Sequence, residues 1–428
     1  PAPSGRRVFS FSCAIFCPAM PPDELAAWLR LTLTPGVGNA TARRLLAAFG
    51  LPQQVFAQSA SALRQVVTAA QASALLQEPP GLPAQIETTW QWLMQPGEEA
   101  GGPQDAAVTR SIVTLGDENY PPSLLATEDP PLLLYLMGRC DWLQATGWPA
   151  ALAIVGSRNP TPQGQINARQ FAQALAGQMA VVSGLALGID GAAHEGALQG
   201  AQPERLATIA VIGTGADRVY PARHRDLAHR IARQGLLVSE YPLGTPPVAA
   251  NFPKRNRIIA ALSQSILICE AGLRSGTFST ALAAGQMGRD LYAVPGSIFS
   301  PESMGANQLI AEGAHIIASE IDLEQRISLD FGMLRMVGEG VPRQEGRILS
   351  ALMSEPTRPD DLARYLAEPV TSILVALSDY EGAGMVKRLP DGRYSLSESA
   401  YLARDRMVGH HEKERIGRPD QEGNGDAG

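Results

Sequence analysis

Residues 151–164, ALAIVGSRNPTPQG, combine a short apolar strand, a glycine-containing turn and the start of a helix. Five further apolar stretches of strand length follow, and a helix-length segment separates each from the next. This alternation predicts an α/β fold built on a doubly wound, mostly parallel sheet. The five stretches are AVVS (180–183), ATIAVI (207–212), LLVS (236–239), SILIC (265–269) and LYAV (291–294).

Each of the six strands runs into a turn of small, polar or glycine residues. Ligands of doubly wound sheets bind in the crevice beyond the carboxyl ends of the strands. We therefore expect the turns to gather on one edge of the sheet and to line a binding site. They are Gly156-Ser157-Arg158, Ser183-Gly184-Leu185, Gly213-Thr214-Gly215, Ser239-Glu240-Tyr241, Glu270-Ala271-Gly272 and Pro295-Gly296-Ser297.

The turn Gly156-Ser157-Arg158 has the chemistry of a phosphate site. Glycine lets the backbone approach a ligand, serine offers a hydroxyl, and the planar guanidinium fits phosphate oxygens. Ser183-Gly184 and Ser275-Gly276-Thr277 add small residues whose backbone N–H groups can form an anion-binding nest. We expect all three turns to contact an anionic ligand.

A cationic segment, NFPKRNR (251–257), opens an otherwise apolar helix. Its three cations stand where a sequence selected only for stability would place acids, because cations at a helix N-terminus oppose the macrodipole. An anionic ligand resolves this conflict, and Phe252 is then placed to stack on a nucleobase. The alternatives are that the cations pair with acids such as Glu240 or Glu270, and that Phe252 packs in the core.

Composition excludes several classes of protein. The chain of 428 residues has 35 Lys and Arg against 42 Asp and Glu, so a nucleic-acid site must be a local patch rather than an overall basic surface. No run reaches the roughly 18 apolar residues of a membrane span. Four scattered cysteines, without disulfide or zinc spacing, favour a reducing cytoplasm and no metal site; they are Cys13, Cys17, Cys140 and Cys269.

Signatures of cofactor enzymes are missing from the sequence. There is no phosphate loop of the G-x-x-x-x-G-K-[ST] type and no nucleophile elbow of the G-x-S-x-G type. The turn at Gly213-Thr214-Gly215 lacks the third glycine of a dinucleotide fingerprint. We therefore expect a binding protein with no catalytic residues and no cofactor.

The segments that flank the sheet predict further domains. Residues 1–21 are expected to be a non-native or disordered extension, 22–107 a helical domain of the helix-hairpin-helix (SAM-like) type with a linker, 108–325 the sheet domain, 343–398 a winged helix and 404–428 a disordered tail.

The helix-hairpin-helix pattern lies at Pro35-Gly36-Val37-Gly38 and the helix that follows. Such a hairpin can hold a phosphate on backbone N–H groups at a helix start. Gly36, Gly38 and Arg43 are the candidate contacts. The alternative is a hairpin that only packs two helices together.

The expected third helix of the winged helix, residues 370–381, contains no Lys or Arg and ends with Asp379 and Glu381. A helix that reads duplex DNA needs cations around it to neutralise phosphates. A protein-contact or structural role is therefore favoured over a duplex-reading regulator.

Taken together, these motifs resemble the DprA/Smf family, the DNA-processing proteins of natural transformation. The resemblance covers about residues 110–318. The matching strings, in family order, are GSRNPTPQG, VSGLALGIDGAAHEGAL, VIGTGADRVYP, SEYPLGTPP, NFPKRNRIIAAL, EAGLRSGTFSTALAA, AVPGSI and MGANQLIAEGA.

This resemblance implies an extended Rossmann core that binds single-stranded DNA and forms a homodimer through that core. It also implies loading of the RecA recombinase onto the strand, with displacement or bypass of single-strand binding protein. The DNA site implied by the matching motifs consists of Gly156, Ser157, Arg158, Ser183, Gly184, Phe252, Lys254, Arg255, Asn256, Arg257, Ser275, Gly276 and Thr277.

The core is also similar, more distantly, to cytokinin-activating phosphoribohydrolases, which have a P-G-G-x-G-T-x-x-E motif. Gly276-Thr277 matches the Gly-Thr of that motif, but Thr280 stands where the acid is needed. A nucleotide or ribosyl-phosphate hydrolase is therefore the alternative function, and the missing carboxylate argues against it.

Overall fold

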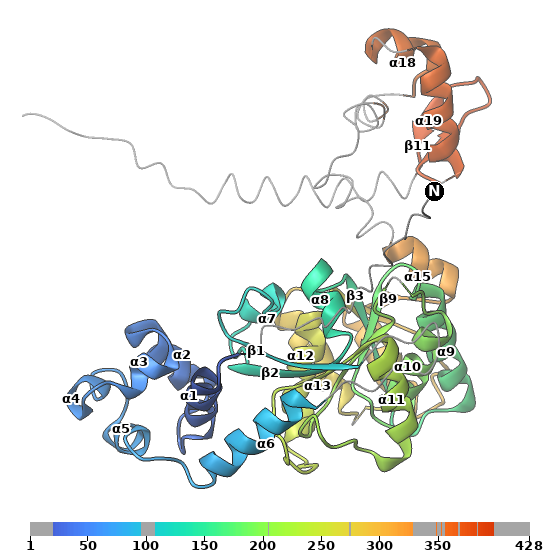
Figure 1. Ribbon diagram of the computed structural model, residues 1–428. Helices are drawn as coiled ribbons and strands as arrows, with labels where there is room; N and C mark the ends of the chain where they lie inside the picture. The colour runs from blue at the N-terminus through green and yellow to red at the C-terminus, as the bar shows by residue number, and fades with distance from the viewer. Residues whose placement is uncertain are drawn as a thin grey trace, which may run out of the picture. The chain divides into compact units, whose positions relative to one another are not determined.

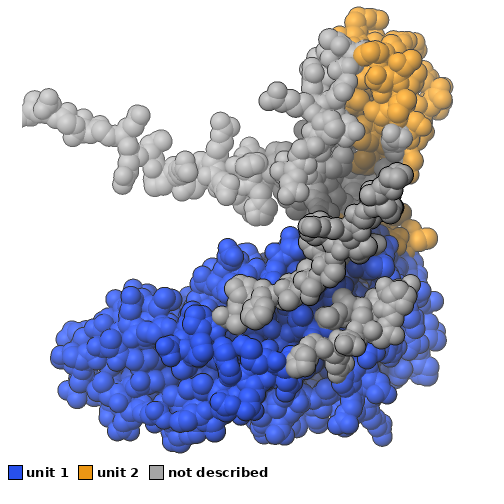
Figure 2. Space-filling model, viewed as in Figure 1, with its two compact units in different colours: residues 1–320 blue, residues 321–428 orange. Residues whose placement is uncertain are grey.

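The computed structural model divides the chain into two compact units, residues 1–320 and 321–428, which Figure 2 distinguishes by colour. The expected extension up to residue 19, the linker at 96–107 and the tail from 404 onward lie outside the residues that the structure describes. The described residues are 20–95, 108–203, 205–273, 275–327, 348, 352, 356–366, 369–382 and 384–397.

A nine-stranded sheet forms the centre of the first unit, within its described residues (Figure 1). The strand order is β1-β2-β6-β5-β4-β3-β7-β8-β9. All neighbours from β6 to β9 pair in parallel, whereas β2 is antiparallel to both β6 and β1. The strands are β1 (Thr109–Thr114), β2 (Leu133–Gly138), β3 (Ala151–Gly156), β4 (Ala180–Ser183), β5 (Thr208–Val211), β6 (Leu236–Ser239), β7 (Ser265–Glu270), β8 (Asp290–Ala293) and β9 (His315–Ile316).

The prediction of a doubly wound, mostly parallel sheet is confirmed, and the six predicted strands are β3 to β8. Every residue of β4, β5, β6 and β7 is buried. This explains their unbroken apolar runs, because central parallel strands are covered by helices on both faces.

Helices cover both faces of the sheet. On one face, α12, α13 and α14 pack on alternate strand residues such as Ala153 and Val155, and α10 and α11 pack on the other. The helices and the short 3-10 helix η1 that accompany the sheet are α7 (Pro122–Leu125), α8 (Cys140–Thr146), α9 (Pro162–Leu175), α10 (Ile189–Gln199), η1 (Ala222–His224), α11 (Arg225–Gln234), α12 (Asn251–Leu262), α13 (Thr277–Gln286) and α14 (Met304–Ala311). Helix α15 (Glu320–Ile327) begins at the boundary of the two units.

The winding direction of the chain changes between β3 and β7. From β3 the chain builds outward through β4, β5 and β6, and it then returns to place β7 on the opposite side of β3. The connections after β3 and β7 therefore diverge in opposite directions. A crevice at the carboxyl ends of these two strands follows from this topology.

The N-terminal helices pack on the β1–β2 edge of the sheet (Figure 1). Trp28 and Leu31 belong to the same hydrophobic cluster as Leu133 and Tyr135 of β2. The helical segment and the sheet therefore share one core. These helices are α1 (Pro22–Leu33), α2 (Asn39–Phe49), α3 (Pro52–Phe56), α4 (Ala60–Leu63), α5 (Ala69–Leu75) and α6 (Leu82–Met94).

The described part of the second unit has the helices and hairpin of a winged helix. Helix α19 occupies the segment expected for the third helix, and a two-stranded antiparallel hairpin follows it. The core includes Leu362, Ile373, Leu377 and Tyr394. The elements are α18 (Pro359–Leu366), α19 (Val370–Gly382), β10 (Val386–Arg388) and β11 (Tyr394–Leu396). In the described parts of both units, no helix has the length and apolarity needed to cross a bilayer.

Candidate nucleic-acid interface

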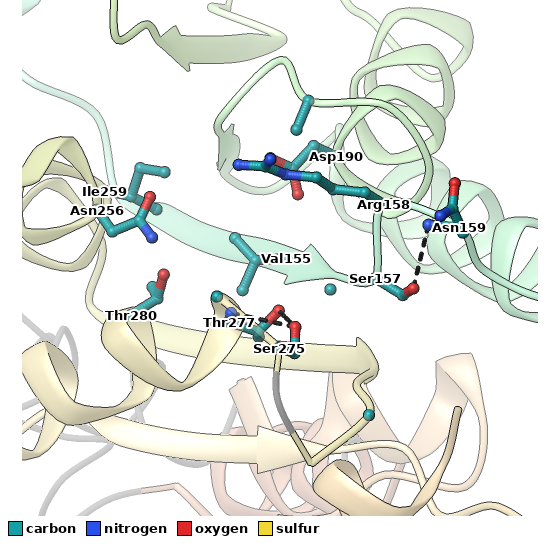
Figure 3. A pocket seen from close by; sticks show the side chains of 14 residues that line it. Val155, Ser157, Arg158, Asn159, Asp190, Asn256, Ile259, Ser275, Thr277 and Thr280 are labelled. Atoms are coloured by element: carbon teal, nitrogen blue, oxygen red, sulfur yellow. Dashed lines mark hydrogen bonds between the residues drawn. The ribbon is translucent and has the colours of Figure 1, made fainter. Parts of the chain in front are cut away.

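A cavity of about 410 Å³ lies at the β3–β7 switch point (Figure 3). The turn after β3, the first turn of α10, Asn256 and Ile259 of α12, and the start of α13 all contribute to it. Figure 3 shows Arg158 and Asp190 together on one side of Val155, with Ser275 and Thr277 on the other. The lining residues are Val155, Gly156, Ser157, Arg158, Asn159, Ala186, Asp190, Asn256, Ile259, Gly272, Ser275, Gly276, Thr277 and Thr280.

Gly156 allows β3 to approach β7 closely. A Cβ atom on this residue would lie 2.6 Å from the carbonyl oxygen of Glu270 and 2.7 Å from the side chain of Ile189. The next amide, that of Ser157, donates to the same Glu270 carbonyl at 2.7 Å. The glycine therefore shapes the floor of the cavity, and it leaves Ser157 and Arg158 at the rim.

Arg158 is the exposed cation of the cavity. Its Cζ atom lies 5.6 Å from the ring centroid of Phe252, which is within cation–π range. No carboxylate of the described residues forms a salt bridge with it, although its charge lowers the pKa of nearby Asp190 as a minor contribution. Its guanidinium is therefore available to an anionic ligand.

Ser275, Gly276 and Thr277 form the start of α13, where the amides of Phe278 and Ser279 already donate to the carbonyls of Ser275 and Gly276. The N-cap of α13, Gly276, has no side-chain cap, and a Cβ atom built on it would meet nothing within 4 Å. The hydroxyls of Ser275 and Thr277 lie 2.7 Å apart, and the Thr277 amide donates to Ser275 Oγ at 3.2 Å. The positive end of the α13 dipole therefore faces the cavity beside two hydroxyls, and an anion-binding nest at this helix start stays a prediction.

Arg255 points into the protein instead of toward the cavity. Its Nη1 atom donates to the carbonyl of Gly184 at 2.7 Å and also to that of Val211, and its Nε donates to Asn256 Oδ1 at 3.2 Å. Burial lowers its pKa to about 10, so it stays charged at neutral pH, and the nearby Asp190 carboxylate favours that charge. The predicted phosphate contact is therefore a buried strut between strand ends.

The turn after β4 is buried and forms hydrogen bonds that hold residues of the site in place. Ser183 is fully buried and donates to the Ile154 carbonyl at 2.6 Å. The Gly184 amide donates to Asp190 Oδ2 at 3.1 Å, and a Cβ atom there would lie 2.6 Å from both Asp190 and Arg255. Neither Ser183 nor Gly184 lines the cavity. Burial raises the pKa of Asp190, and the Arg255 charge acts in the opposite direction.

Lys254 and Arg257 lie beside acids. Arg257 forms a two-pronged ion pair with the buried Glu240, at 3.1 and 2.7 Å, and a second pair with Asp129 at 3.3 Å. Lys254 Nζ lies 3.6 Å from Glu240 Oε2, and about half of its side chain is exposed. The alternative of pairing with Glu240 therefore describes both Arg257 and Lys254, although Lys254 stays partly accessible. We call these four residues the Glu240 cluster.

Glu270 has a different partner from the one considered in the sequence. Its carboxylate accepts the Thr161 amide at 2.9 Å and the Thr161 hydroxyl at 2.6 Å. It thereby occupies the N-terminus of α9, where its negative charge is stabilised by the helix dipole. This helix start is closed to a ligand.

Asn256 and Phe252 lie on either side of the buried arginine in α12. Asn256 lines the cavity and donates from Nδ2 to Ser279 Oγ at 2.8 Å, which fixes its amide. Phe252 is half-buried against Gly213, where an added Cβ atom would lie 2.9 Å from the ring. One face of this ring belongs to the core, and Arg158 lies over the ring from outside.

The helix-hairpin-helix residues do not line the cavity. Gly36 has a φ of +75°, which favours glycine, and its carbonyl accepts Gln71 Nε2 at 2.8 Å. Arg43 donates to the Glu128 carbonyl at 2.6 Å and so ties α2 to the loop after α7. Gly38 begins α2 without a side-chain cap. A phosphate role for Gly36, Gly38 and Arg43 stays a prediction.

Sequence reasoning missed several cavity residues, among them Asn159, Ala186 and Asp190. Asp190 lies in the first turn of α10, whose N-cap, Gly188, has no side-chain cap. His194 is buried and bonded to Thr208 at 2.7 Å, and burial lowers its pKa to about 3. No group of three potential metal ligands occurs among the described residues.

Comparison with known proteins gives the family. The model of the DNA recombination-mediator protein A family matches residues 111–328, and that of the DprA winged helix domain matches residues 338–392. Protein Smf of Escherichia coli (strain K12) is 35% identical over 330 residues, which is 74% of this chain and 83% of Smf. DNA processing protein DprA of Streptococcus pneumoniae is 42% identical over 207 residues, which is 48% of this chain and 71% of that protein.

A solved structure supports the same assignment. The X-ray structure of DNA processing protein A (DprA) from Streptococcus pneumoniae has a TM-score of 0.57 and 31% sequence identity, and the match covers 72% of this chain and 98% of that chain. The first family model alone covers more than half of the 428 residues. This chain therefore belongs to the DNA recombination-mediator protein A family, the DprA/Smf proteins.

Proposed function

We propose that this protein binds single-stranded DNA and delivers the strand to the RecA recombinase during natural transformation. The observation that carries the proposal is the cavity at the β3–β7 switch point, where Arg158, which has no salt bridge among the described residues, lies across from the start of α13 and its two hydroxyls. Both groups attract anions, and they lie on opposite sides of a space that is open to solvent. Phosphate is the anion that suits a planar guanidinium and a helix N-terminus together.

The aromatic ring beside the cavity favours a single strand over a duplex. Phe252 lies next to Arg158, so a strand whose phosphate meets the arginine brings a base near the ring. A base can stack on a side chain only after it has left its own stack, which a single strand permits readily. The winged helix does not favour duplex reading, because α19 (Val370–Gly382) contains no Lys or Arg.

The partners are proposed from the family resemblance. We propose that the sheet domain, 108–325, holds the DNA and forms the homodimer, and that the winged helix, 343–398, has a protein-contact or structural role. RecA and single-strand binding protein are the partners to test. We place the protein in the cytoplasm, whose reducing environment keeps cysteine thiols reduced.

Hydrolysis of a nucleotide is the alternative use of the same cavity. Thr280 lines the cavity, so the position where the related hydrolases have their acid does face the ligand space. Within the described lining, the one carboxylate is Asp190, and it is engaged by the Gly184 amide and the Arg255 charge. A binding function fits this arrangement better than acid–base chemistry does.

The first experiment is binding of a labelled dT oligonucleotide to the full chain and to the Arg158→Ala variant, across a series of salt concentrations. We expect the variant to bind at least about tenfold more weakly, because a charged hydrogen bond contributes about 1.5–3 kcal/mol and 1.4 kcal/mol corresponds to a factor of ten. The slope of log K against log salt should fall by about 0.7 for the lost phosphate contact.

The matched control is Arg230→Ala. Arg230 is also exposed, but it pairs with Glu195 and does not line the cavity. The Arg230→Ala variant should leave both the affinity for the dT oligonucleotide and the salt slope unchanged. Equal affinity and slope for Arg158→Ala and the unmodified chain would exclude the cavity as the DNA site. Turnover of a nucleoside monophosphate by the purified chain would favour the hydrolase instead.

A further inference from the structure

A second aromatic ring continues the candidate site beyond Phe252. The Tyr220 ring centroid lies 5.5 Å from that of Phe252, with an angle of 38° between the ring planes. Arg158 lies on the same Phe252 ring, with its Cζ atom 5.6 Å from the centroid. The three side chains therefore form a connected row, cation–ring–ring, that begins at the cavity and ends at Tyr220.

Tyr220 is unusually accessible for a large aromatic side chain. It is 48% exposed, whereas Tyr120, Tyr135 and Tyr292 are buried. Apolar surface left in water costs about 25 cal/mol per Å². A base that covers this ring would recover part of that cost, and it would extend the surface that Phe252 begins.

The loop that contains Tyr220 is held firmly at the edge of the cavity. Residues 212–224 connect β5 with α11 and include η1 (Ala222–His224). The His224 ring nitrogen Nδ1 lies 3.0 Å from the Leu185 carbonyl, and the ring packs so closely on Gly191 that a Cβ atom there would lie 2.7 Å away. The neighbour of Leu185, Ala186, lines the cavity. Tyr220 therefore belongs to a fixed rim.

The same loop carries positive charge. Arg223 and Arg225 are exposed, and no described carboxylate forms a salt bridge with either of them. Arg218 lies 3.8 Å from Asp217 and is half exposed. Tyr220 thus lies close in sequence to cations that form no salt bridge among the described residues, so phosphates and bases would both find partners in this segment.

We propose that Tyr220 is a second base-stacking platform and that Arg223 contacts the phosphate beside it. The strand then runs from the cavity at Arg158 across Phe252 to the loop after β5. This inference rests on the proposed function, and it adds the direction that the strand takes and a segment, 217–225, that binds it.

The test uses the full chain and three probes: a dT oligonucleotide long enough to span the row, the same length of abasic sugar-phosphate, and a dinucleotide. Tyr220→Ala should weaken binding of the dT oligonucleotide about fivefold or more, at the lower end of the range for loss of one stacked base. It should leave the affinities for the abasic strand and the dinucleotide unchanged. Tyr220→Phe keeps the ring and should bind like the unmodified chain.

Thermal denaturation of each variant accompanies the binding assay. If Tyr220→Ala does not fold, Tyr220→Leu replaces it, because leucine keeps apolar bulk without an aromatic face. Arg223→Ala should lower the salt slope by about 0.7, since one phosphate contact is lost.

The outcomes separate the two proposals. Binding of dT by the unmodified chain, with equal affinity in Tyr220→Ala, overturns this inference and leaves the proposed function standing. Equal losses on dT and on the abasic strand also overturn it, because they indicate a structural role of Tyr220. Absence of dT binding by the unmodified chain overturns both.

Discussion

The replacement of Arg255 by methionine tests most sharply whether this cation is a strut or a DNA contact. Methionine keeps an unbranched apolar stem but removes the charge and the bonds to the carbonyls of Gly184 and Val211. It also leaves Asp190 buried without its cationic neighbour. Removal of one partner from a buried charged pair costs about 3–5 kcal/mol. At about 2 °C or more per kcal/mol for a unit of this size, the melting temperature should fall by about 6–10 °C.

The destabilisation caused by Arg255→Met should depend on pH in a defined direction. Burial raises the pKa of Asp190 above 3.8, and Arg255 works against that rise. Without Arg255 the folded-state pKa rises further, so the folded variant favours the protonated carboxyl. A carboxyl group whose pKa is higher in the folded chain than in the unfolded chain stabilises the fold at low pH. That stabilisation is lost as the pH rises through the folded-state pKa. The melting temperature of Arg255→Met should therefore lie further below that of the unmodified chain at pH 8 than at pH 5.

The assay is thermal denaturation at both pH values, with Arg230→Met as the control for loss of a paired surface arginine. DNA binding is then measured below the melting temperature. A folded Arg255→Met should keep the salt slope of the unmodified chain. An unchanged melting temperature together with a slope reduced by about 0.7 would refute the strut and restore Arg255 to the DNA contacts.

Two further predictions concern groups around the site. Glu240→Gln removes the acid of the Glu240 cluster and leaves Lys254 and Arg257 less neutralised. A unit charge about 10 Å from a phosphate in water contributes about 0.4 kcal/mol to the binding free energy. The affinity for a dT oligonucleotide should therefore rise about twofold at low salt and return to the original value at high salt. An effect that persists at high salt would argue against electrostatics. Burial lowers the pKa of His194 to about 3 in the folded chain, whereas the ordinary value is 6.5. As the pH falls below 6.5, the unfolded chain therefore binds a proton at His194 and the folded chain does not, which destabilises the fold. His194→Asn should therefore lose less melting temperature between pH 7 and 5 than the unmodified chain; an equal loss would assign the acid sensitivity to other groups.

The sheet was predictable because strands and turns are local features. Each apolar run that ends in a small or polar turn, such as that before Gly156, became a strand whose carboxyl end faces the same edge. The strand order was not predicted, because parallel pairing joins segments that are distant in the chain. The β1–β2 edge likewise shares its core with the N-terminal helices, a contact that no local pattern reveals.

The site was predictable in part, and the orientation of side chains explains the rest. Arg255 lies three, four and seven residues before Ile258, Ile259 and Leu262, which are all buried, so helical spacing already placed it on the inner face. The run of cations, taken alone, does not indicate this inward orientation of Arg255. The partners of Arg257 come from distant segments, and its ion pair with Asp129 spans 128 residues. Such contacts depend on the completed sheet.

Photo-cross-linking tests the central claim most directly, which is that phosphates of a single strand occupy the cavity at the β3–β7 switch point. A dT oligonucleotide with photoreactive thymines is irradiated on the full chain, and the linked peptides are mapped by mass spectrometry. The account predicts cross-links in 156–159, at Phe252 and in 275–277. Cross-links confined to the helices of 20–95 or to the winged helix would contradict it.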